Sequence, residues 1–148
     1  MARAQCIVHR EDKLLMAKHH LNGKTWWCLP GGSIEKGETP AEAALRELEE
    51  ECCVRGQIIY KTNHLMAPME YETHTFLVDI GDQTPTLGHD PEVALGQQAL
   101  ALCDVQWLRL SEIPERDRAL LWGAGLLGIA TFLTEALDWG NSISYPQT

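Results

Sequence analysis

The sequence predicts a mixed α/β fold in which helices cover a mixed β-sheet. Three observations support this prediction: short apolar stretches are spread along the chain, one amphipathic helix has strong capping signals, and an uncharged helical region lies near the C-terminus. The chain has 148 residues, enough for one compact domain with a hydrophobic core and too few for two. We therefore expect residues 1–148 to form a single domain.

Apolar stretches bounded by turn residues are expected to form the strands. They are Ala4–Val8, Lys13–Ala17, Trp26–Leu29, Val54–Tyr60, Tyr71–Ile80 and Val105–Leu110. A short polar turn joins the first two, and Asn22-Gly23 predicts another turn. Residues 81–96 carry Gly, Pro and Asp throughout and predict a long loop, which in a compact domain is more often functional than idle.

The final helical region is expected to begin at residues 111–114 and to continue through residues 119–134, which carry no charge. That run is shorter than the roughly 20 residues of a membrane span, and its three glycines lower its helix propensity. We therefore expect a buried or interface helix and no membrane association. Its large apolar side chains lead to the hypothesis of a homodimer; they are Leu126, Leu127, Phe132 and Leu133.

Composition excludes several classes of protein. The five cysteines are Cys6, Cys28, Cys52, Cys53 and Cys103. Their odd number and the lack of Cys-x-x-Cys spacing argue against a disulfide framework or a structural zinc site, so we expect small buried thiols in a reducing, cytoplasmic setting. No export signal is recognised at the N-terminus. The net charge of −9 argues against a nucleic-acid partner.

Negative charge is crowded into one short stretch. Between Gly31 and Glu51 lie seven glutamates against Lys36 and Arg46, so 7 − 2 = 5 of the nine net negative charges fall there. Thr39-Pro40-Ala41-Glu42 predicts a helix start, because Thr39 can cap the helix, Pro40 suits its first position and Glu42 completes a capping box. At about 100° per residue, one apolar stripe forms the expected core face: Ala41, Ala44, Leu45, Leu48 and Cys52.

The same rotation gathers Glu47, Glu50 and Glu51 on one flank of the helix and places Glu49 on the other. Like charges at these spacings destabilise a helix, and the helix dipole disfavours them near its C-terminal end. Arg46 supplies only one positive charge against three. A bound divalent cation explains the cluster, and oxygen ligands favour Mg²⁺ or Mn²⁺ over zinc. The alternative is a solvated acidic face.

The residues from Gly32 to Val54 resemble the Nudix box, G-x5-E-x7-R-E-U-x-E-E-x-G-U, where U is an aliphatic residue. The approach Trp27-Cys28-Leu29-Pro30-Gly31-Gly32 is also similar to that family. One position departs from the pattern, because Cys53 stands where the box has glycine. Either Cys53 adopts the left-handed conformation at a cost of about 1 kcal/mol, or the helix continues towards Gly56.

The resemblance implies a MutT-like Nudix hydrolase, of no assigned subfamily, with an α/β/α sandwich around a mixed sheet. It implies metal-dependent hydrolysis by water of a phosphoanhydride bond in a nucleoside diphosphate linked to another moiety. Glu47, Glu50, Glu51 and the backbone carbonyl of Gly31 would be the metal ligands. Glu38 would support the loop or a metal-bound water, Arg46 would hold the glutamates, and Gly32 is a candidate for substrate binding.

Other candidates carry competing structural explanations. The general base is either a box glutamate or a residue of the long loop, where Asp90 and Glu92 are candidates and are otherwise ordinary loop residues. Candidates for substrate contacts lie elsewhere: Tyr71, at the offset typical of dinucleoside-polyphosphate hydrolases; Pro68, near the proline of ADP-ribose hydrolases; and His19, which with Lys18 and His20 would contact phosphate. Tyr71 otherwise belongs to the core or a strand, and His19 to a solvated strand end.

Four further residues are candidates for lining a pocket that binds the nucleotide base, and a packing role explains each of them as well: Trp26, Met66, Met69 and His74. Two other functional classes remain open. A Nudix-like domain that senses a nucleotide without cutting it would be favoured by loss of box glutamates, and all are present. An interaction protein that uses the apolar C-terminal helix would leave the box unexplained.

Overall fold

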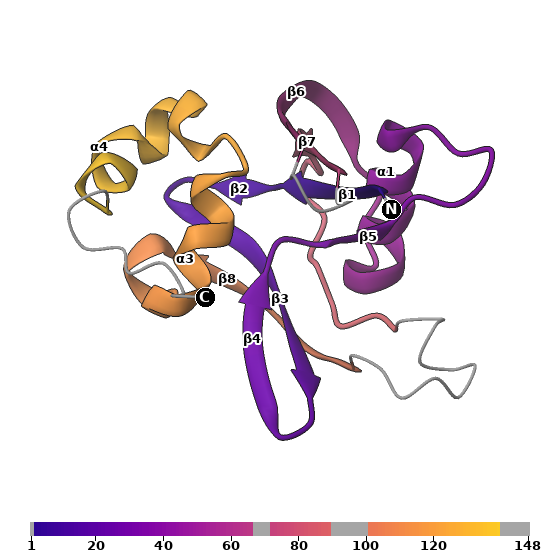
Figure 1. Ribbon diagram of the computed structural model, residues 1–148, viewed down its shortest axis with the longest axis horizontal. Helices are drawn as coiled ribbons and strands as arrows, with labels where there is room; N and C mark the ends of the chain where they lie inside the picture. Colours follow the sequence, from indigo (N-terminus) through magenta and orange to yellow (C-terminus); the bar gives the residue numbers. More distant parts are fainter. Residues whose placement is uncertain (1, 67–71, 90–100, 140–148) are drawn as a thin grey trace.

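The computed structural model describes residues 2–66, 72–89 and 101–139, and the strands within these ranges form two four-stranded sheets (Figure 1). The first sheet has the order β5-β1-β7-β6, formed by Gly31–Ser33, Ala2–Ile7, Glu72–Asp79 and Gln57–Met66. It is mixed, because β1 runs parallel to β7 and the other pairs are antiparallel.

The second sheet is antiparallel and is built around the long strand β3, Lys13–Leu21. β3 pairs with β2 (His9–Arg10), with β4 (Lys24–Cys28) and with β8 (Ala101–Arg109). β1 and β2 are separated only by Val8, so one stretch of chain passes from the first sheet to the second. The Val8 carbonyl accepts a hydrogen bond from the backbone N–H of Leu15 in β3 at 2.8 Å.

Helices cover the sheets on opposite sides, with α1 (Pro40–Cys52) on one side and α3 (Glu115–Trp122) and α4 (Ala130–Trp139) on the other (Figure 1). Since successive strand residues point to opposite faces, each central strand contributes to two cores. In β1, Cys6 packs in the core beneath α1, and Ile7 packs in the core beneath the C-terminal helices. In β3, Leu15 packs in the core beneath α1, and Met16 packs in the core beneath the C-terminal helices.

This layered arrangement confirms the predicted α/β/α fold, although several strand boundaries were wrong. β3 is longer than predicted, and β6 starts and ends later than the predicted strand Val54–Tyr60. β5 was not predicted, because a Gly-Gly-Ser sequence has low strand propensity and is recruited here by pairing with β1. The predicted polar turn after Val8 contains the short strand β2.

Helix α1 has the predicted N-terminus. The Thr39 side chain accepts the backbone N–H of Glu42, and the Glu42 side chain accepts the backbone N–H of Thr39, each at 3.1 Å. The buried face is displaced from the predicted apolar stripe towards the glutamates: its buried residues are Ala43, Ala44, Leu48, Glu51 and Cys52. Ala41 and Leu45 are only partly buried against this core. Tertiary packing therefore places one carboxylate on the core side of the helix.

Cys53 ends the helix in the left-handed conformation, with φ 58° and ψ 34°, and its N–H donates to the Glu49 carbonyl. The first of the two predicted alternatives for this residue is therefore confirmed. Cys53 and Cys103 are exposed, which contradicts the expectation that every cysteine is buried, whereas Cys6 and Cys52 are buried. All five cysteines are free thiols.

Replacing Cys53 with glycine is expected to stabilise the protein by about 0.5–1 kcal/mol, because relief of the left-handed strain exceeds the larger chain entropy of unfolded glycine. The free energy of unfolding measured in urea would show the change. Cys53→Ala is the matched control, since it removes the thiol and keeps Cβ. Equal stabilities of the glycine and alanine variants would contradict the prediction.

The C-terminal region is not one continuous helix. α3 and α4 are separated by the 3-10 helix η2 (Leu126–Gly128), within the glycine-containing stretch whose helix propensity is low. Another 3-10 helix, η1 (Leu110–Glu112), precedes α3. Leu126 and Phe132 are each 1% exposed in the core, so the predicted dimer surface was wrong for these two residues. Leu133 is exposed, and the Leu127 side chain lies outside the described residues.

No helix in the described part of the chain has the length and apolar composition needed to cross a bilayer.

Candidate active site

Arg46 gathers three of the candidate carboxylates where α1 meets β5. Its guanidinium contacts Glu38 through two nitrogen atoms, at 2.7 and 3.1 Å, and contacts Glu47 and Glu50 at 3.1 Å each. It also donates to the Ser33 carbonyl at 3.0 Å, which ties the helix to the end of β5. One arginine therefore holds residues from the loop, the strand and the helix together.

The charges within this cluster do not balance. Glu38, Glu47 and Glu50 bring three formal negative charges, and Arg46 brings one positive charge. The hydrogen bond from Arg46 holds the pKa of Glu38 below its ordinary value, and the same bond raises the pKa of Arg46 further above neutrality. All four side chains are at most a quarter exposed, so water screens the remaining negative charge only in part. The arrangement favours a further cation.

Glu51 lies apart from this cluster and is only 2% exposed. Its Oε1 accepts the backbone N–H of Gly31 at 2.8 Å, and its Oε2 lies 3.5 Å from His19 Nε2. The hydrogen bond joins the helix to the first residue of β5. The predicted role of the Gly31 carbonyl as a metal ligand stays a prediction, and the structure shows its N–H in contact with the glutamate.

Gly32 permits close packing of Glu47 against β5. A Cβ on Gly32 would lie 2.5 Å from Glu47 Oε1, well inside van der Waals contact. Any larger residue would push the carboxylate away from the strand. This is a steric reason for glycine at the start of the box, and the predicted contact of Gly32 with substrate stays a prediction.

A segment of the long loop caps the C-terminal end of α1. The N–H groups of Thr86, Gly88 and His89 donate to the carbonyls of Cys52, Glu51 and Glu50, at 2.9, 2.8 and 3.0 Å. These carbonyls have no partners within the helix, so the loop satisfies them next to the glutamates. A Cβ on Gly88 would lie 1.8 Å from the Glu50 carbonyl oxygen, which explains glycine at that position. The sequence predicted the loop but not this docking.

The remaining candidates are divided between the described and the undescribed parts of the chain. His19 is 3% exposed, so the preferred interpretation of it as a solvated strand end was wrong; its neighbour His20 is exposed. His74 is buried on β7 and contacts Glu72 and Lys61. Tyr71, Pro68, Met69, Asp90 and Glu92 lie outside the described residues, as does the side chain of Met66. Asp90 directly follows His89 in the chain.

Three cysteines lie within electrostatic reach of Glu51. Burial raises the pKa of Cys28 to about 12 and raises the pKa of Cys6 and Cys52 above the ordinary value, and the nearby Glu51 charge acts in the same direction for all three. Cys6 Sγ donates to the Ala44 carbonyl at 3.2 Å. These thiols are neutral at pH 7, so they serve as packing groups and not as nucleophiles.

Comparison with known proteins identifies the family. The NUDIX domain model matches residues 1–125, and the chain belongs to this family. The acidic helix and the layered fold are therefore those of a Nudix domain.

Among individual proteins, the chain is similar to Phosphatase NudJ of Escherichia coli K12 and of Shigella flexneri, with 34% identity over 92 residues in each case. The match spans 60% of this chain and 60% of the length of each relative.

Solved structures show the same fold. A NUDIX hydrolase from Nitrosomonas europaea superposes with a TM-score of 0.67 at 20% identity, over 99% of this chain and 75% of the other. A MutT NUDIX hydrolase from Burkholderia pseudomallei superposes with a TM-score of 0.64 at 17% identity, over 82% of this chain and 95% of the other.

Proposed function

We propose that the protein catalyses metal-dependent hydrolysis of a phosphoanhydride bond in a nucleoside diphosphate linked to another moiety, with water as nucleophile. One observation carries the proposal: Glu47 packs against Gly32, Glu51 accepts the N–H of Gly31, and Arg46 holds Glu47 and Glu50 together on α1. Membership of the Nudix hydrolase family and similarity to proteins named Phosphatase NudJ support it.

The residues fit a hard divalent cation, either Mg²⁺ or Mn²⁺. Within residues 2–66, 72–89 and 101–139, no group of three His, Cys, Asp or Glu side chains is already arranged around a metal position. The donors that would hold the ion are the carboxylates of Glu47, Glu50 and Glu51 and the carbonyl of Gly31, all oxygen atoms as these ions prefer. Once bound, the ion would neutralise the diphosphate oxygens and lower the pKa of the attacking water.

The protein's own residues would position these groups. Arg46 would release part of its hold on Glu47 and Glu50 and keep its paired contact with Glu38. The N–H of Gly31 would hold Oε1 of Glu51 in place beside β5. A carboxylate would take the proton of the attacking water, and the candidates are a box glutamate, Asp90 and Glu92.

The testing experiment is a substrate panel with Mg²⁺ present, scored for release of phosphate or pyrophosphate. It would include nucleoside triphosphates, ADP-ribose, NADH, diadenosine polyphosphates and sugar nucleotides. We expect turnover of at least one anhydride and none of a phosphate monoester. Binding of these compounds with no hydrolysis of any of them would reject the proposal and favour the nucleotide-sensing alternative. We also propose a cytoplasmic setting, which the five free thiols support.

A further inference from the structure

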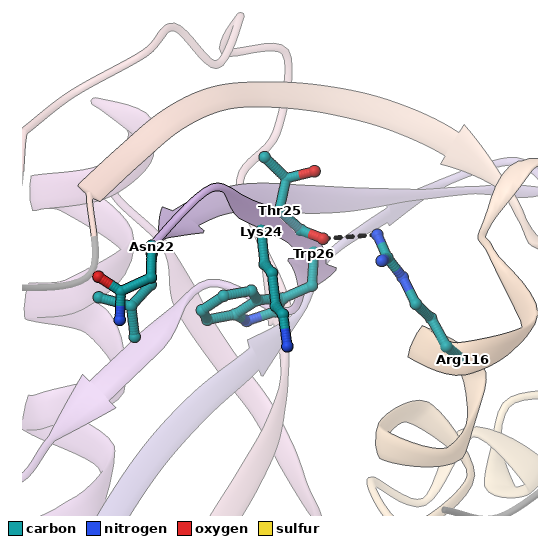
Figure 2. Close-up of a pocket in the computed structure, with 6 residues that line it drawn as sticks. Asn22, Lys24, Thr25, Trp26 and Arg116 are labelled. Carbon is teal, nitrogen blue, oxygen red and sulfur yellow. Dashed lines mark hydrogen bonds between the residues drawn. The ribbon is translucent and has the colours of Figure 1, made fainter.

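A cavity of about 400 Å³ lies between the β3–β4 hairpin and the start of α3, outside the box (Figure 2). Six residues line it: Leu21, Asn22, Lys24, Thr25, Trp26 and Arg116. Its volume lies in the range of small-molecule sites. An aromatic ring and two cationic side chains meet in it, and none of the lining residues is acidic, although the chain carries a net charge of −9.

Contacts between distant parts of the chain build the wall of this cavity. Arg116 donates a hydrogen bond to the Thr25 carbonyl (Figure 2), and its Nε lies 3.5 Å from Asp117 Oδ1. Asp117 is 4% exposed and accepts the backbone N–H of Trp27 at 3.0 Å. These contacts dock α3 on β4 and hold the Arg116 guanidinium across the cavity from the ring of Trp26.

Trp26 connects the cavity to the candidate active site. It pairs with His19 across β3 and β4, and the two rings are stacked with centroids 6.4 Å apart. His19 Nε2 in turn lies 3.5 Å from Glu51 Oε2. A substrate whose diphosphate lies at the glutamates therefore has this cavity within reach of the group attached to the diphosphate.

The side chains that line the cavity favour a particular type of ligand. A tryptophan ring stacks on a planar aromatic base. Lys24 and Arg116 are donors only, and Arg116 has N–H groups beyond the one that Thr25 accepts. The acceptors in the lining side chains are the Asn22 and Thr25 oxygens. An excess of donors favours a base edge rich in acceptors, such as the O6 and N7 atoms of guanine or the O4 atom of uracil, over the amino group of adenine.

We propose that this cavity binds the base of the nucleotide substrate, stacked on Trp26, with Lys24 and Arg116 donating to a keto oxygen. Guanine and uracil are then preferred to adenine. The identification of this base as part of the substrate rests on the proposed function. Binding of the base to the cavity does not itself require hydrolysis.

Isothermal titration of the full chain with GMP, UMP and AMP in the presence of Mg²⁺ tests the proposal, because these monophosphates contain no anhydride bond. GMP and UMP should bind more tightly than AMP. Trp26→Leu should weaken GMP binding roughly tenfold, as expected for loss of base stacking, and Trp26→Phe should retain most of it.

Arg116→Gln should reduce the ratio of GMP affinity to AMP affinity, while Arg109→Gln, at an exposed arginine on β8 outside the cavity, should leave both affinities unchanged. If Trp26→Leu fails to fold, the comparison of Arg116→Gln with Arg109→Gln still tests the proposed base site.

Equal affinity for GMP and AMP, or unchanged GMP affinity in both Trp26→Leu and Arg116→Gln, would overturn the base site, even if anhydrides are hydrolysed. GMP binding that depends on Trp26 and prefers keto bases would support the site, even if the substrate panel shows that the proposed function fails.

Discussion

Replacement of Glu51 by glutamine is expected to lower kcat roughly 10²–10⁴-fold and to leave the fold intact. Glutamine keeps an oxygen that can accept the Gly31 N–H at the position where Glu51 accepts it at 2.8 Å. The substitution removes the negative charge and one of the two side-chain oxygen atoms that could coordinate a metal ion. The same loss is expected for Glu50→Gln, since Arg46, which contacts that carboxylate at 3.1 Å, is shared with Glu38 and Glu47. Steady-state kinetics at saturating Mg²⁺ would measure both.

Glu49 provides a matched control on the same helix. It lies on the opposite flank, is exposed and contacts only the exposed Arg55 among its described ion pairs, at 3.4 Å. Glu49→Gln should therefore retain wild-type kcat. Circular dichroism and the midpoint of unfolding would establish that all three variants are folded. Wild-type rates in both Glu50→Gln and Glu51→Gln would show that these carboxylates are not the catalytic ligands.

Removal of divalent cations with a chelator is expected to reduce turnover to the uncatalysed background, and added Mg²⁺ or Mn²⁺ should restore it. The reason is electrostatic: the glutamate cluster repels an anionic diphosphate until a cation lies between them. Titration calorimetry with each ion, with and without nucleotide, would measure binding directly.

The Glu50→Gln and Glu51→Gln variants serve again as controls for this experiment, because each should bind the ion more weakly than the wild-type protein. Full activity after exhaustive chelation would reject the metal assignment. Activity that returned only with zinc would instead reject the inference drawn from oxygen-only donors.

Local sequence signals predicted α1 and its surroundings well. The capping box of Thr39 and Glu42 depends on contacts three residues apart, so it can be read directly from the chain, whereas the sequence left the helix end open between Cys53 and a continuation towards Gly56. The contact of Arg46 with Glu50 follows from the i, i+4 spacing of a helix, whereas its contact with Glu47, the next residue, does not. Periodicity also placed Glu51 on this flank, but it did not reveal that this carboxylate is buried.

Predictions that depended on distant contacts were less successful. β5 exists because it pairs with β1, nearly thirty residues away, and its own composition gives no strand signal. His19 was expected at a solvated strand end, and the pairing of β3 with β4 and β8 buries it beside α1. The apolar C-terminal region was expected to be a buried or interface helix, and Leu126 and Phe132, two residues of the hypothetical dimer surface, lie in the protein's own core.

The sequence by itself determined the acidic helix, the identity of its carboxylates and the family to which the chain belongs, because spacing along a helix specifies which side chains share a flank. Only the tertiary structure decided that Glu51 is held by Gly31, that Gly88 docks on the helix end and that Arg116 faces Trp26 across a cavity. Strand pairing and helix docking join residues 20 to 90 positions apart, and no local periodicity encodes those distances.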